Sequence, residues 1–75
     1  MNSTASPAPA QALDVGHWHC ELQARPVSAV FQPVAICRFA QGEPVQLPPD
    51  TEPYATQAEA LRHAQQQAVR YMRQR

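Results

Sequence analysis

Lysine is missing from this sequence, and glycine and cysteine are scarce, with two residues of each. Gly16 and Gly42 stand alone, so the chain has no glycine-rich loop of the kind that holds a phosphate. Cys20 and Cys37 form no CxxC pair, which argues against zinc-ribbon and thioredoxin-like proteins. We expect both cysteines to be free, unreactive thiols that behave as small buried hydrophobic residues in a reducing cytosol.

Long apolar runs are also lacking. No stretch approaches the roughly 20 apolar residues that a membrane-spanning helix needs, and no basic residue followed by an apolar block marks a signal peptide near the N-terminus. We therefore expect a cytoplasmic protein with no membrane contact. Large apolar side chains are few among the 75 residues, so we expect a single domain with a thin core and modest stability.

Catalytic signatures are absent as well. The sequence has no GxSxG motif and no Cys–His–Asn pattern, and its acidic residues are scattered along the chain. His17, His19 and His63 could in principle approach a metal, but a metal site needs three or four converging ligands and the polar side of a helix would point His63 away from a sheet. We expect no catalytic residues, no metal and no cofactor.

The first 13 residues differ in composition from the rest of the chain. Residues 1–13 are small, polar and proline-bearing, without aromatic side chains, so they bury too little surface to offset the entropy lost on ordering. We predict a disordered N-terminal tail over 1–13 and a single small α+β domain over 14–75.

Two extended segments are predicted within this domain. From His17 to Ala24, apolar and polar residues alternate, which places Trp18 in the core and His19 on the opposite face. Residues 25–29 are expected to interrupt the strand, because proline cannot donate to a ladder. Residues 30–39 are rich in β-branched and aromatic side chains, and both of their faces are partly apolar. Either this is a central strand with a half-exposed Val34 and Ile36, or a bulge near Pro33 reverses the register.

A hairpin loop at 40–43, a short edge strand at 44–47 and a long helix complete the pattern. Thr56 and Glu59 match a capping box, and residues 57–73 contain no glycine or proline. One half of this helix carries apolar residues for docking on a sheet, and the other half is polar, with Gln67 among its polar residues. The predicted fold is a three-stranded antiparallel sheet packed on one C-terminal helix, βββα.

The most interesting surface predicted from the sequence is a patch on the open sheet face, formed by Val34, Ile36, His19 and Arg38. Apolar residues on an uncovered face are typical of a protein contact, so we expect a non-enzymatic protein-interaction module that binds an unknown partner or a second copy. The alternative is a nucleic-acid-associated protein. Its contacts would come from the helix arginines Arg62, Arg70, Arg73 and Arg75, or from a sheet face carrying His17, His19, Gln32 and Arg38. A net charge of zero disfavours that alternative, and cations also suit the end of a helix.

Over residues 17–73 the order of segments resembles short uncharacterised bacterial proteins with a β-β-β-α layout. The resemblance depends on the Trp18 strand, on 31–34, on 44–48 and on the helix start at 56–60 with its later alanines. It implies no known activity. Tyr71 and Met72 depart from it, because a tryptophan and an aliphatic residue are expected there.

Overall fold

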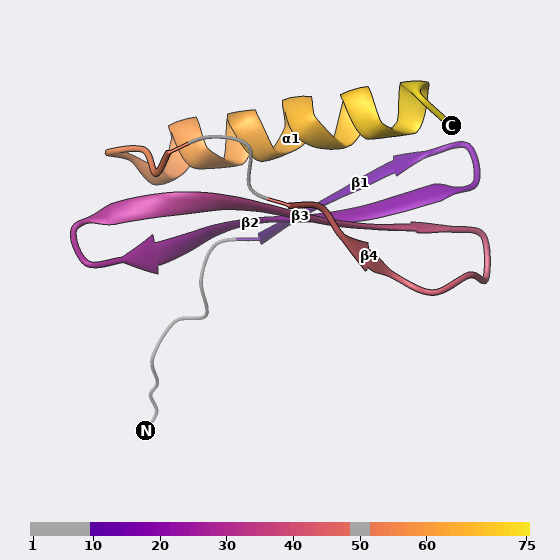
Figure 1. The fold of residues 1–75 in the computed structure, drawn as a ribbon, viewed down its shortest axis with the longest axis horizontal. Coiled ribbons are helices and arrows are strands. Elements are labelled where there is room, and N and C mark those ends of the chain that lie inside the picture. The colour runs from indigo at the N-terminus through magenta and orange to yellow at the C-terminus, as the bar shows by residue number, and fades with distance from the viewer. Residues whose placement is uncertain (1–9, 49–51) are drawn as a thin grey trace.

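The computed structural model describes residues 10–48 and 52–75 and forms a two-layer α+β fold. Four strands, β1 (Ala10–Val15), β2 (Trp18–Val27), β3 (Val30–Phe39) and β4 (Val45–Gln46), make one antiparallel sheet in sequence order. The helix α1 (Gln57–Arg73) covers one face of this sheet, and no other helix of the described residues covers the opposite face, which we call the open sheet face (Figure 1). The predicted fold class is confirmed, with one strand more than expected.

The additional strand is β1, and it corrects the predicted domain boundary. Residues 10–13 were assigned to a disordered tail, but they pair with β2 from Ala10 opposite Gln23 to Val15 opposite Trp18. A two-residue turn at Gly16 and His17, with Gly16 at a φ of 58°, folds the chain back tightly enough to form this hairpin. The ordered domain therefore begins no later than Ala10, and the part of the predicted tail at 1–9 lies outside the described residues.

The β2–β3 hairpin is longer than predicted. The prediction that residues 25–29 interrupt the strand is wrong, because β2 continues to Val27. Only Ser28 and Ala29 form the turn that leads into β3. The register runs without a bulge from Trp18 opposite Phe39 to Val27 opposite Val30, residues that are all described.

Two prolines lie inside these strands. On β2, Pro26 lies outside the stretch from Trp18 to Gln23 that pairs with β1. On β3, Pro33 lies outside the two residues, Ile36 and Cys37, that pair with β4. In an antiparallel ladder the N–H groups of alternate residues point to opposite neighbours. Within the described residues no strand pairs with either proline on that side, so a missing N–H costs no ladder bond there.

Cys20 and Cys37 are directly opposite each other in this register, with their Cα atoms 4.0 Å apart, and they form a disulfide. The prediction of free thiols is therefore wrong. Both residues are buried as predicted, at 0% and 1% exposure, and they lie in the core cluster with Leu22 and Ala35. The disulfide thus crosslinks the two central strands beneath the helix.

The helix begins and ends where the sequence predicts. Thr56 is its N-cap, and the Thr56 hydroxyl accepts the Glu59 amide N–H at 3.2 Å and donates to the Glu59 carboxylate at 3.1 Å. Ala60, Ala64 and Ala68 are fully buried, so the backbone of α1 approaches the sheet closely. The polar assignment of Gln67 is wrong, because it is 8% exposed and its amide donates to the carbonyl oxygen of Pro48, at the start of the connection into α1.

Candidate interaction surfaces

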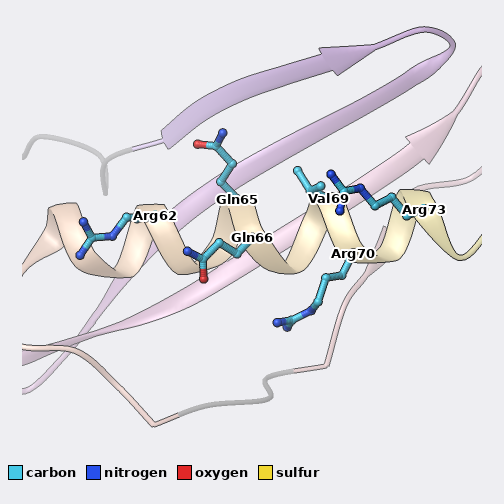
Figure 2. Close-up of a pocket in the computed structure, with 6 residues that line it drawn as sticks. All are labelled: Arg62, Gln65, Gln66, Val69, Arg70 and Arg73. Carbon is cyan, nitrogen blue, oxygen red and sulfur yellow. The ribbon is translucent and has the colours of Figure 1, made fainter.

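The outer face of α1 carries a cluster of arginines. With Ala60, Ala64 and Ala68 on the sheet, the helical period directs another set of side chains away from it. This set lines a shallow hollow, which we call the basic helix face: Arg62, Gln65, Gln66, Val69, Arg70 and Arg73 (Figure 2). The figure shows Arg62 and Arg73 near opposite ends of the helix, with Val69 between them and Arg70 projecting to the other side.

The charge along the chain is strongly segregated. Six arginines balance six acidic residues overall, but residues 60–75 contain four of the arginines and no acid. The remainder of the chain, residues 1–59, therefore holds two arginines and all six acids. Glu59, the acid nearest to these arginines in sequence, accepts a hydrogen bond from the Thr56 hydroxyl at the first helical turn. A protein with no net charge thus presents one hollow whose charged lining, among the described residues, consists of arginines.

The four arginines predicted for nucleic-acid contact do not all lie together. Arg62, Arg70 and Arg73 share the basic helix face. Arg75 lies elsewhere, with its guanidinium 4.9 Å from the centre of the Tyr71 ring and a nitrogen 3.3 Å from the Tyr71 hydroxyl. Arg75 therefore belongs to a different surface.

That second surface is an aromatic cluster at the C-terminal end of the helix, which sequence reasoning missed. Trp18 packs edge-on against Phe39 at 5.0 Å and against Tyr71 at 5.5 Å, and these three residues line a small hollow with Arg75. Trp18 is half-buried against the core, as predicted, and its neighbour Phe39 is 52% exposed. The register would have revealed the cluster, because Trp18 and Phe39 are cross-strand partners.

The open sheet face brings together three of the four residues predicted for it. His19 is opposite Arg38, Glu21 is opposite Ile36, and these four residues line a hollow with Pro44. The fourth residue, Val34, was expected to be exposed and is not, with 5% exposure. Ile36 is half-buried, and the Nδ1 of His19 pairs with the Asp14 carboxylate. This face therefore has mixed charges and little exposed apolar surface.

The three histidines lie in separate environments. His17 contacts the edge of the Phe39 ring at 6.0 Å, His19 pairs with Asp14, and His63 stacks on Tyr54 at 4.2 Å. Within residues 10–48 and 52–75, no group of three histidine, cysteine or acidic side chains is arranged to hold a metal ion. The structure thus does not bring the candidate ligands together.

No helix in the described part of the chain is long and apolar enough to cross a membrane. Comparison of the chain with protein-family models, with curated proteins and with solved structures finds no match.

Proposed function

We propose that this chain is a small non-enzymatic protein-interaction module that binds an acidic helical segment of a partner through the basic helix face. The observation that carries this proposal is the grouping of Arg62, Arg70 and Arg73 around Val69, with no acid among the described residues that line the basic helix face. Such a surface repels a second copy of itself and attracts an anionic partner.

The mixed chemistry of the face favours a protein over a nucleic acid. Protein interfaces combine an apolar centre with a polar rim and are enriched in arginine. Arg62, Gln66, Val69 and Arg73 follow the alternating four- and three-residue spacing at which one helix meets another. A dedicated nucleic-acid surface is more uniformly basic and usually belongs to a basic domain, whereas this chain has no net charge.

The non-enzymatic part of the proposal is supported by the sequence and by the placement of side chains. No nucleophile motif occurs, and the histidines of the described segments lie apart: His19 shares a hollow with Glu21, while His17 packs on Phe39 and His63 stacks on Tyr54. The hollow on the basic helix face is lined by arginines, glutamines and a valine, which are suited to binding and supply no group for acid–base chemistry near neutral pH.

The cytoplasmic location expected from the sequence is a further proposal, and the disulfide is the observation that weighs against it. Disulfides persist mainly in oxidising compartments, while cytosolic thiols are kept reduced. Binding through the helix requires neither state, because Cys20 and Cys37 lie beneath α1 and the basic helix face points away from them. Fractionation of host cells combined with alkylation of their free thiols tests the location. Alkylated protein in the cytosolic fraction supports it, and oxidised protein in a secreted fraction contradicts it.

Site-specific photo-crosslinking tests the binding surface. We expect a photoreactive residue at Gln66 to crosslink to a protein in the native host, through a segment rich in Asp and Glu. Arg62→Ser with Arg73→Ser should abolish this crosslink, whereas Arg25→Ser, which changes an exposed arginine on β2, should leave it intact. A nuclease-sensitive product would support the nucleic-acid alternative. A crosslink obtained from Ile36 and not from Gln66 would move the binding surface to the open sheet face.

A further inference from the structure

We propose that two copies of this chain pair antiparallel along β1, which joins two four-stranded sheets into one continuous sheet with both helices on the same face. This dimer goes beyond the binding function proposed above and does not depend on it. The first observation is that β1 ends the strand order, and within the described residues no strand pairs with its outer side. An exposed edge of this length, without proline or lysine, is a template for another strand.

The opposite edge of the sheet is closed to such pairing. β4 is only two residues long and lies between Pro44 and Pro48. Farther along the same edge, Phe31 and Tyr54 exchange two backbone hydrogen bonds, at 2.7 and 2.8 Å. Short strands and prolines are the usual means by which an edge is protected, and β1 has neither.

The register shows which backbone groups β1 directs outward. Cys20 and Cys37 are the closely spaced kind of antiparallel pair, so the N–H and C=O of Cys20 point away from β3 and toward β1. Its partner Leu13 therefore bonds inward, and the neighbouring residues Ala12 and Asp14 direct their N–H and C=O groups away from the sheet. These groups can meet the same groups of a second copy.

Apolar side chains follow the same edge. Leu13 and Val15 are on the helix side of β1, and Val15 remains 49% exposed. Leu61 and Met72 of α1 are half-buried and, like Leu13, pack against the core cluster. A two-fold axis at Leu13 would place Leu13 opposite Leu13 of the second copy, and directly paired side chains in a sheet are about 5 Å apart.

Charge permits this pairing and forbids the obvious alternative. Asp14 is the only charged residue of β1, it pairs with His19 of its own chain, and in this register it faces Ala12 of the second copy. A symmetric contact between two basic helix faces would instead oppose arginines to arginines. Self-association is thus directed to the sheet edge, and the helices remain open to another partner.

Ala12→Pro tests the proposal, because it removes an outward donor from each chain while leaving the inward bonds of Leu13 in place. Sedimentation should show a concentration-dependent dimer for the natural sequence. The proline variant should raise the dimer Kd about tenfold or more, since two interchain hydrogen bonds are lost per dimer. Ala12→Thr keeps the N–H and is the matched control, which should still dimerise.

Hydrogen exchange on the natural sequence provides a second measurement that does not depend on how the variant folds. Protection of the Ala12 and Asp14 amides should rise with protein concentration, while the Leu13 amide stays protected throughout. A chain that remains monomeric into the millimolar range, or a dimer that Ala12→Pro leaves unchanged, would overturn the proposal. Ala12 and Asp14 amides that exchange equally fast at every concentration would overturn it as well.

Discussion

The disulfide between Cys20 and Cys37 closes a loop within a chain whose core has few large side chains. The two cysteines are 17 positions apart in the sequence. Among the described residues, the three largest fully buried side chains are Leu22 and these two cysteines. Crosslinking restricts the unfolded chain more than the folded one, and a loop of this length contributes about 3 kcal/mol to stability. A thin core makes that contribution a large fraction of the total.

We therefore expect a reducing agent to lower the free energy of unfolding by about 3 kcal/mol. Urea denaturation with and without reductant measures this difference, and mass spectrometry after alkylation reports the redox state. The double variant Cys20→Ala, Cys37→Ala should not respond to the reductant. An unchanged urea midpoint for the natural sequence on reduction would contradict a stabilising disulfide.

Val34 and Ile36 are separated by one residue on β3 and differ in exposure. Val34 is 5% exposed and Ile36 is half-buried on the same strand. Val34→Thr introduces a hydroxyl into a buried site without an assured partner, so it should cost about 1–3 kcal/mol of stability. Ile36→Thr retains strand propensity at a more exposed position and should cost less than about 1 kcal/mol.

Separate urea titrations of the two single variants check this difference. Equal costs for the two substitutions would mean that the burial of Val34 contributes nothing to stability.

At the scale of the element, the helix cap is the sharpest local feature. Thr56 accepts the Glu59 N–H and donates to its carboxylate, so one hydroxyl serves two partners. Thr56→Ala should lower the free energy of unfolding by about 1 kcal/mol, because an amide of the first turn loses its acceptor. Thr56→Ser keeps the hydroxyl and should restore most of the stability. A urea midpoint that Thr56→Ala leaves unchanged would place the start of the helix elsewhere.

The elements that the sequence predicts well are those with a strong local pattern. The alternation from Trp18 to Ala24 and the uninterrupted helix formers after Thr56 each determine an element without help from the rest of the chain. Strand β1 has no such pattern, since Ala10, Gln11 and Ala12 are small or polar and acquire their structure from pairing with β2. Its formation depends on tertiary context that composition does not reveal.

The error about the cysteines has its physical origin in the turn at Ser28 and Ala29, whereas the error at Val34 has another. Ser28 has a φ of 56°, a conformation more usual for glycine or asparagine, so the two residues carry no clear turn signal. Once that turn is known, Cys20 and Cys37 are equally distant from it and must be partners. Val34 differs, because alternation predicts which face a side chain occupies but does not predict how far its neighbours cover it.

At the scale of the whole molecule, the layers divide the candidate sites. The sheet supplies the edge for a second copy, and the helix supplies the basic face, of which the sequence predicted Arg62, Arg70 and Arg73 as members. The helical period alone made that prediction possible. The aromatic cluster of Trp18, Phe39 and Tyr71 could not be predicted from the sequence, because it joins two strands and a helix end that only the folded chain brings together.

The separation of arginines from acids also places four of the six arginines of this neutral molecule on or just after α1. Its isoelectric point is about 6.8, a value that would suggest no retention by an ion-exchange resin near neutral pH. At 0.1 M salt, charges farther apart than a Debye length of about 10 Å are largely screened from each other. Attraction of the protein to a resin therefore depends on the charges of the surface nearest to the resin and not on the net charge. The chain should therefore bind a sulfonate resin through α1 at low ionic strength near pH 7, and Arg62→Ser with Arg73→Ser should release it at lower salt than Arg25→Ser. The resin then selects the orientation of the molecule, with the helix toward the matrix and the open sheet toward the solvent.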